Sequence, residues 1–205
     1  MQPIIITKDI IKRDFPVSII TTVLLIVCLI AGQFITGKPS LNAVAGIIML
    51  ISFTAYIISL VRSALNKNKN GEIEDMENIK SRSLPVSIAL IVTGLAGVIV
   101  GGDLVVDSAS ALAAKFGMSE TLIGLTIVAI GTSLPELVTS IVAAKKGEAD
   151  LALGNVIGSN IFNILFVLGM SSVLNTITVS IDSVIDTALL IAVNIAVLAI
   201  VLIKK

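Results

Sequence analysis

The chain has 205 residues, of which 56% are hydrophobic and 14% charged, and its formal net charge is zero. Soluble domains have about 45–50% apolar and about 25% charged residues, so this composition excludes an ordinary soluble domain and predicts a polytopic membrane protein. At zero net charge we expect no nucleic-acid partner, and the single cysteine, Cys28, excludes a disulfide framework.

Six apolar segments are long enough to cross a bilayer, because a spanning helix needs about 20 predominantly apolar residues. We expect them at about residues 16–36, 41–61, 84–112, 119–144, 150–174 and 184–203. The third segment is long and contains Gly101, Gly102 and Asp103, so we expect it to tilt, to kink or to continue past the membrane surface. The fold class is therefore all-α, a polytopic helical membrane protein.

Basic residues predict how these spans are oriented. With residues 62–82 in the cytoplasm and the spans alternating, twelve Lys and Arg residues lie inside, and only Lys38 and Lys115 lie outside. Because cytoplasmic loops carry the excess of positive charge, both termini are expected in the cytoplasm. Polar residues 63–83 predict a cytoplasmic linker, disordered or loosely helical, between a two-span part (1–62) and a four-span part (84–205).

The fourth span contains helix-breaking residues and an acid near its middle, in the stretch GTSLPE. Pro135 cannot donate the helical hydrogen bond that the carbonyl of Gly131 would accept, so the helix is expected to break there. Glu136 lies nine residues before Lys145, which places it about 13 Å from the cytoplasmic end of the span. An acid at this depth costs about 2.5–3.5 kcal/mol and is expected to face a partner or a water-filled cavity.

Oxygen donors gather around this acid. Thr132 and Ser133 lie four and three residues before Glu136, on the same helical face, and carbonyls near Ala129 can turn away from a broken helix. Carboxylate, hydroxyl and carbonyl oxygens are the ligands of hard cations, so the stretch predicts a cation site. The alternative is a protonated Glu136 that only hydrogen-bonds a neighbouring helix.

The fifth span has a polar stripe and two glycines. Asn155, Ser159 and Asn163 recur every four residues, and Asn163 lies at the same expected depth as Glu136. Gly154 and Gly158 have the spacing that lets a neighbouring helix approach closely. The stripe is therefore a second candidate wall of the cation site, although polar groups of this kind can also serve only as hydrogen-bonded contacts between helices.

The stretch GLTIVAIGTSLPELVTSIVAAKKGEADLALGNVIGSNIFNI resembles the alpha-repeat of the sodium/calcium exchanger family, at about residues 122–165. The resemblance implies ten helices in two inverted repeats with alternating access, in which residues 1–62 resemble the end of the first half and 84–205 the second. It implies that Glu136 is the principal ligand of transported Ca²⁺ and Na⁺, with no further cofactor. The other implied metal ligands are Ala129, Thr132, Ser133, Ser159 and Asn163, of which Asn163 is neutral where the family has Asn or Asp.

GTSLPE occurs once in the chain, whereas the family site uses two copies. One carboxylate leaves a divalent cation half-compensated, so we expect either a missing first repeat and last helix, or pairing with a second copy of the chain. The expected function is a Ca²⁺/Na⁺ antiporter in the lipid bilayer, in the plasma membrane of a prokaryote. The alternatives are a cation/proton exchanger, a passive channel or a structural membrane fragment. An intramembrane hydrolase is disfavoured, because the chain has no histidine and no pair of membrane aspartates.

Overall fold

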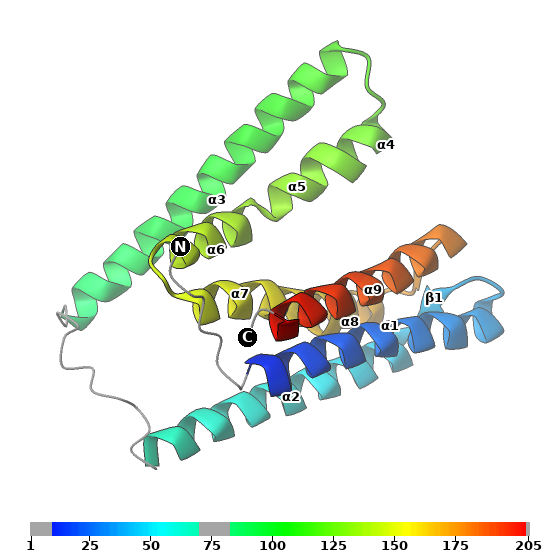
Figure 1. Ribbon diagram of the computed structural model, residues 1–205. Helices are drawn as coiled ribbons and strands as arrows, with labels where there is room; N and C mark the ends of the chain where they lie inside the picture. Colours follow the sequence, from blue (N-terminus) through cyan, green and yellow to red (C-terminus); the bar gives the residue numbers. More distant parts are fainter. Residues whose placement is uncertain (1–9, 70–82, 204–205) are drawn as a thin grey trace. The chain divides into compact units, whose positions relative to one another are not determined.

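The structure is a computed structural model that describes residues 10–69 and 83–203 (Figure 1). Its elements are almost all helical, with three π-helical segments, labelled η, in which backbone N–H groups bond five residues back. In chain order they are η1 (Ile10–Asp14), α1 (Phe15–Thr36), β1 (Ser40–Leu41), α2 (Ala43–Lys69), α3 (Leu84–Lys115), α4 (Glu120–Ile123), η3 (Gly124–Val128), α5 (Ala129–Thr132), α6 (Leu134–Lys145), α7 (Ala149–Phe162), η4 (Asn163–Leu168), α8 (Gly169–Leu174), β2 (Ile177–Thr178) and α9 (Ile181–Ile203).

The six expected spans are present within the described residues. Helical stretches long and apolar enough to cross a membrane run over Ile10–Thr36, Ala43–Asn66, Leu84–Lys115, Glu120–Lys145, Ala149–Leu174 and Ile181–Ile203. The third is one helix of 32 residues, unbroken at Gly101, Gly102 and Asp103. At 1.5 Å per residue it is about 48 Å long, so it exceeds the roughly 30 Å hydrocarbon core and must tilt or extend beyond it.

Prolines and glycines mark several of the helix boundaries. Pro85 lies in the first turn of α3, where a missing N–H leaves no helical bond unmade. Pro16 lies at the junction of η1 and α1. Gly37 follows α1 with φ of +77°, a left-handed conformation that favours glycine, and its N–H donates to the carbonyl of Gln33 at 2.8 Å. By contrast, α2 continues to Lys69, so residues 63–69 of the expected linker are helical, and residues 70–82 lie outside the described residues.

The chain divides into two compact units. Unit 1 comprises residues 1–73 and 146–205, and unit 2 comprises residues 74–145. In unit 1, α1 packs on α9 and α7, while α2 packs on α8 and η4 (Figure 1). In unit 2, α3 packs along α4, η3, α5 and α6.

The core of unit 1 combines apolar packing with buried polar contacts. Phe53, Phe162 and Phe166 form an aromatic cluster with ring centroids 5.0 to 5.7 Å apart. Between α1 and α9, the buried Ser18 hydroxyl donates to Oδ1 of Asn194 at 3.3 Å. The Asn194 amide nitrogen donates in turn to the carbonyl of Leu190 at 2.9 Å, so these polar groups find partners inside the apolar bundle.

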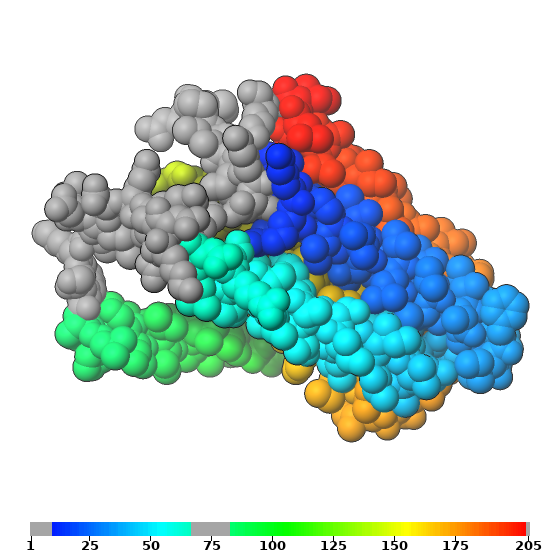
Figure 2. All heavy atoms as spheres, turned by 90° about the horizontal axis from the view of Figure 1, so that it is seen from below, coloured from blue at the N-terminus to red at the C-terminus, as the bar shows by residue number. Residues whose placement is uncertain are grey.

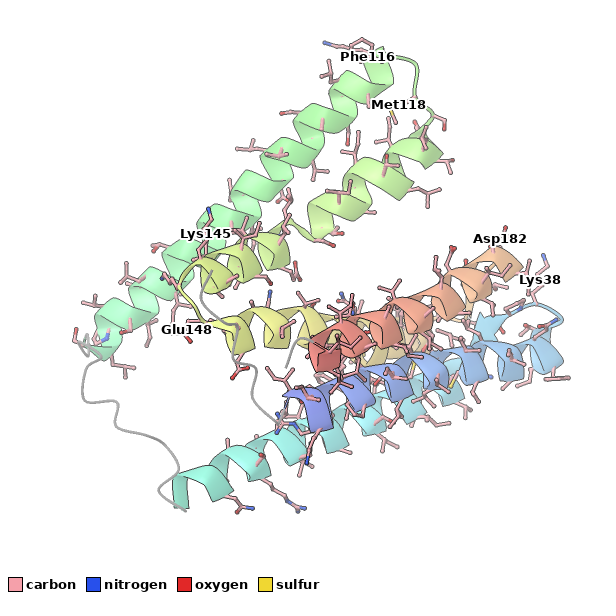
Figure 3. The ribbon with its side chains drawn as sticks, viewed as in Figure 1. Lys38, Phe116, Met118, Lys145, Glu148 and Asp182 are labelled. Carbon is pink, nitrogen blue, oxygen red and sulfur yellow. The ribbon has the colours of Figure 1, made fainter. Side chains whose placement is uncertain are left out.

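A short antiparallel pairing, not expected from the sequence, joins the two turns at one end of unit 1. Ser40 pairs with Thr178 and Leu41 with Ile177, which links the α1–α2 turn to the α8–α9 connection. Lys38 and Asp182 lie at this same end (Figure 3). The pairing leaves no room for a side chain at Gly32, where an added Cβ would overlap the carbonyl oxygen of Ser40.

Close helix packing in unit 1 depends on glycines other than the expected ones. A Cβ added at Gly46 of α2 would lie 2.5 Å from Oγ of Ser172 and 2.6 Å from the carbonyl oxygen of Gly169, both on α8. A Cβ added at Gly154 or Gly158 would meet no described atom within 4 Å. Within unit 1, the tight contact with α2 is made by α8 rather than α7, and close approach of another helix at Gly154 and Gly158 stays a prediction.

Candidate cation site

The predicted break in the fourth span is present. Helix α5 ends at Thr132 and α6 begins at Leu134, with Ser133 between them at φ −95° and ψ 0°. The N–H of Ser133 donates to the carbonyl of Ile130 at 3.1 Å, a tight turn that ends α5. Pro135 explains the break, since it lacks the N–H that a continuous helix would direct to Gly131.

The break places Glu136 in the first turn of a new helix. Glu136 is half-buried, and α6 runs for 12 residues beyond the break. A helix N-terminus carries a partial positive charge, so the first turn stabilises an ionised carboxylate. Ser133 and Glu136 also have the S-x-x-E spacing of a helix-capping box, which gives Glu136 a structural alternative to ion binding.

The two hydroxyls beside the break are oriented by the backbone. Thr132 donates from Oγ1 to the carbonyl of Ala129 at 3.0 Å, and Ser133 donates from Oγ to the same carbonyl at 3.4 Å. A hydroxyl has one proton and two lone pairs, so an oxygen that has donated its proton to the backbone can only accept. Both side chains are exposed within unit 2 and present acceptor oxygens, which suit a cation rather than an anion.

The carbonyl of Ala129, expected as a ligand, is in contact with both of these hydroxyls. A carbonyl oxygen has two lone pairs, and here each has a hydroxyl donor. Ala129 would therefore have to exchange one of these hydrogen bonds for an ion contact, and the longer bond from Ser133 is the easier one to replace. Its role as a ligand stays a prediction.

Gly131 has a packing role besides its expected effect on helix flexibility. A Cβ added there would overlap Cγ2 of Val106 on α3 and would lie 3.2 Å from its Cβ. The absence of a side chain at Gly131 thus lets α3 lie directly against the turn that precedes the break. Helix α3 consequently supports the segment that carries Thr132 and Ser133.

Ser159 and Asn163 lie in unit 1, where each is part of a helical face. The hydroxyl of Ser159, half-buried on α7, donates to the carbonyl of Val156 at 3.1 Å and so also presents an acceptor oxygen. Asn163 is exposed and begins η4. The common depth expected for Asn163 and Glu136 stays a prediction.

Two π-helical segments adjoin the expected ligands, and sequence reasoning missed both. Segment η3 ends at Val128, directly before Ala129, and η4 begins at Asn163. Such segments are rare and are frequent at functional sites, because they displace the normal helical hydrogen bonds. Gly124 at the start of η3 is a weak local signal, and the sequence of η4 offers none.

Acidic ligands are sparse in the part of the chain that the structure describes. Within residues 10–69 and 83–203, His, Cys, Asp and Glu side chains form no group of three or more that could hold a metal. Besides the Glu136 carboxylate, the candidate ligands that this chain offers are therefore neutral oxygens, of the kind that hydroxyl, amide and carbonyl groups supply.

Comparison with known protein families gives the class of the chain. The family model described as sodium/calcium exchanger protein matches residues 86–205, more than half of the chain. The chain belongs to this family. Sodium/calcium exchanger proteins are membrane transporters and not enzymes, and the helices of this chain identify it as an integral membrane protein of that class.

Individual relatives extend the likeness beyond the family match. The chain is 34% identical over 180 residues to the inner membrane protein YrbG of Escherichia coli, covering 85% of this chain and 53% of that protein. It is 42% identical over 99 residues to the sodium/calcium exchanger MaX1 of Methanosarcina acetivorans, covering 48% of this chain and 28% of that one. The chain thus spans about half the length, or less, of these relatives.

A solved structure confirms the fold class. The sodium–calcium exchanger NCX_Mj, soaked with 100 mM Na⁺ and 10 mM Sr²⁺, matches with a TM-score of 0.72 at 30% identity. The match covers 96% of this chain and 59% of that chain. The expected all-α membrane fold of the exchanger type is therefore present, and this chain accounts for part of it.

Proposed function

We propose that the chain works in a secondary antiporter that exchanges Ca²⁺ for Na⁺ by alternating access, with Glu136 as the principal cation ligand. The observation that carries the proposal is the position of Glu136, half-buried in the first turn of α6 directly after a proline-enforced break. Broken helices with polar groups at membrane depth are characteristic of transporter binding sites. Thr132 and Ser133, with Ala129 after exchange of a hydrogen bond, add neutral oxygens to the same turn.

The charge of the transported ion calls for a second acid. Glu136 alone supplies one negative charge, which half-compensates Ca²⁺, and Na⁺ would be compensated singly. Two such carboxylates would balance one Ca²⁺ or two Na⁺, so the ions would compete for the same groups. We propose that the second carboxylate comes from a corresponding repeat in exchanger sequence outside this chain, or from a second copy. Ser159 and Asn163 remain proposed neutral ligands.

A cation/proton exchanger is a second candidate, because the carboxyl group of Glu136 can itself carry a proton. The two candidates differ in what drives calcium movement. A Ca²⁺/Na⁺ exchanger accumulates Ca²⁺ when a Na⁺ gradient is imposed at constant pH, whereas a proton exchanger responds to a pH gradient without Na⁺.

The test is ⁴⁵Ca²⁺ uptake into proteoliposomes that contain the chain, alone and together with the first half of a sodium/calcium exchanger relative. We expect uptake driven by an outward Na⁺ gradient, abolished by Glu136→Gln. Glu120→Gln is the matched control, since Glu120 lies in the first turn of α4 but outside the proposed site. Uptake that needs only a pH gradient would favour the proton exchanger, and full uptake by Glu136→Gln would exclude Glu136 from the mechanism.

We also propose that the membrane is a prokaryotic plasma membrane, with both termini of the chain in the cytoplasm. The distribution of Lys and Arg along the chain supports this orientation. In this orientation, the β1–β2 end of unit 1, which carries Lys38, faces the outside of the cell. The C-terminal end of α6, which carries Lys145, faces the cytoplasm.

A further inference from the structure

The aromatic cluster joins α2 to the point where α7 passes into the π-helical segment η4. Phe53 of α2 meets Phe162 edge-on, with ring centroids 5.7 Å apart and an interplanar angle of 71°. The centroid of Phe53 also lies 5.4 Å from that of Phe166 in η4. Phe162 and Phe166 stack on each other at 5.0 Å and 24°. Ring quadrupoles favour edge-on and offset-stacked pairs, so the three rings hold one another in a defined arrangement.

The aromatic cluster brackets Asn163, the first residue of η4. Phe162 directly precedes Asn163 and Phe166 follows it by three residues, so both rings belong to the turn that carries the Asn163 side chain. Asn163 itself is exposed, so neighbouring side chains do not enclose its carboxamide. The direction of the carboxamide therefore depends on how η4 is rotated about its axis.

The π-helical geometry of η4 makes this rotation something that the fold has to set. Backbone bonds in η4 reach five residues back instead of four, so the segment holds an extra residue compared with an α-helix. One residue corresponds to about 100° of rotation in a helix with 3.6 residues per turn. The segment thus separates the rotation of α7 from that of α8, and a contact from another element has to fix it.

Helix α2 supplies such contacts along η4 and α8, beside which it lies in Figure 2. On the α8 side, a Cβ added at Gly46 would lie 2.6 Å from the carbonyl oxygen of Gly169. A Cβ added at Gly169 would lie 3.2 Å from Cβ of Met49, which is fully buried. Phe53 lies about one helical turn after Met49 and continues this line of contact to the aromatic cluster. Glycine contacts thus fix α8, and Phe53 fixes the start of η4.

We infer that Phe53 is a positioning residue for the proposed cation ligand Asn163. It sets the rotation of η4 through Phe162 and Phe166, and thereby directs the amide oxygen of Asn163 at the bound cation. Ca²⁺ takes its oxygen ligands at about 2.3–2.6 Å, so a carboxamide that is turned away no longer reaches it. The inference rests on the proposed function and deepens it, since Phe53 acts through Asn163 and touches no ion itself.

A double-mutant cycle tests the inference by equilibrium ⁴⁵Ca²⁺ binding to the chain reconstituted together with the first half of a sodium/calcium exchanger relative. Phe53→Leu stays apolar but loses the ring, and it is expected to weaken binding about tenfold, as loss of groups that orient metal ligands does. Asn163→Ala is expected to weaken binding by a similar factor. Because Phe53 acts through Asn163, the double variant should bind no more weakly than Asn163→Ala alone. Phe53→Tyr, which keeps the ring, should restore binding.

Melting temperatures in detergent separate positioning from stability. Phe53→Leu should lower the melting temperature equally with and without Asn163→Ala, because the lost packing does not involve the carboxamide. Phe15→Leu is the matched control, since Phe15 is a buried phenylalanine of α1 outside the aromatic cluster. It should lower the melting temperature without changing calcium affinity. Phe166→Leu, which opens the cluster from the other side, carries the test if Phe53→Leu fails to fold.

The inference is overturned if the losses of affinity in Phe53→Leu and Asn163→Ala multiply in the double variant. Unchanged binding in Phe53→Leu, or an equal loss in Phe15→Leu, would overturn it too. Unchanged binding in Asn163→Ala would also overturn it, while exchange that depends on Glu136 would stand. If the wild-type assembly bound no calcium, the proposed function itself would be contradicted, and this inference with it.

Discussion

Val106 of α3 lies against Gly131 so closely that no side chain fits at Gly131. This contact joins the long third span to the turn that precedes the helix break. It means that the glycine in GTSLPE serves packing as well as backbone flexibility, and that a change on α3 can displace the segment that carries the candidate ligands.

Gly131→Ala is therefore expected to destabilise the chain by about 1–3 kcal/mol, as overpacked core positions do. The measurement is the apparent melting temperature in detergent. Val106→Ala combined with Gly131→Ala should recover most of the loss, because it removes the overlapping methyl groups. Gly124→Ala is the control, since a Cβ there meets no described atom within 4 Å. Equal effects of the two glycine substitutions would show that the contact with Val106 is not what requires glycine.

Gly46→Ala is expected to separate α2 from α8 and to lower thermal stability more than Gly154→Ala does. The new Cβ at Gly46 would meet Ser172 and the backbone of Gly169, whereas the one at Gly154 meets open space in unit 1. Melting curves of the two variants in the same detergent make the comparison. A larger loss of thermal stability for Gly154→Ala would show that a helix packs tightly against Gly154, as the glycine spacing in the fifth span predicts.

The hydrogen bond between Ser18 and Asn194 is expected to contribute about 0.6 kcal/mol, the average for polar pairs between membrane helices. A double-mutant cycle with Ser18→Ala and Asn194→Leu measures this coupling from reversible unfolding in mixed micelles. Since α1 and α9 also share a long apolar contact, each single variant should remain folded. A coupling of zero would mean that the two side chains find other partners.

The orientation of the chain can be tested by labelling single cysteines in intact cells with a membrane-impermeant maleimide. Cys28 is buried in α1 and is replaced by serine to remove background. Lys38→Cys is expected to react from outside, and Lys145→Cys only after the membrane is permeabilised. The reverse pattern would invert the proposed topology.

The spans could be predicted from the sequence because apolar length alone defines a membrane helix. The break at Ser133 was also predictable, since Pro135 removes a specific backbone donor. The ends of the helices were harder to predict. Helix α2 continues to Lys69 because polar Asn and Lys residues still propagate a helix once it is formed, although they end the apolar run.

Contacts between distant residues could not be read from local patterns. Glycine spacing in the fifth span indicated close packing at Gly154 and Gly158, whereas the close glycine contact in unit 1 is between Gly46 and Gly169. The partner of a helix is set by the whole bundle, which local spacing does not reveal. The Ser40–Thr178 pairing likewise joins residues far apart in the chain. The two π-helical segments beside Ala129 and Asn163 were not expected from the sequence either. Among the candidate ligands, Thr132 and Ser133 were predicted from their spacing to Glu136 and Ala129 from the family resemblance, whereas the engagement of the Ala129 carbonyl by both hydroxyls was not predicted.

Thr132→Val is expected to weaken calcium binding less than loss of the Glu136 charge does. Valine keeps the shape of threonine and the backbone oxygens, and removes one neutral donor. It also frees one lone pair of the Ala129 carbonyl, which partly replaces the lost hydroxyl oxygen. Equilibrium ⁴⁵Ca²⁺ binding to Thr132→Val and to Glu136→Gln shows which substitution weakens calcium binding more. A greater loss of binding in Thr132→Val would make the Thr132 hydroxyl the main ligand.

The most direct measurement is equilibrium ⁴⁵Ca²⁺ binding, with and without competing Na⁺, to the wild-type chain and to Glu136→Gln, each reconstituted together with the first half of a sodium/calcium exchanger relative. Gln keeps the size and the helix-capping capacity of Glu, so only the charge changes. The account predicts saturable binding that Na⁺ displaces, weakened at least about tenfold in Glu136→Gln, since even residues that only support metal ligands cost that much. Glu120→Gln should bind as the wild type does. Undiminished, Na⁺-sensitive calcium binding by Glu136→Gln would contradict the account.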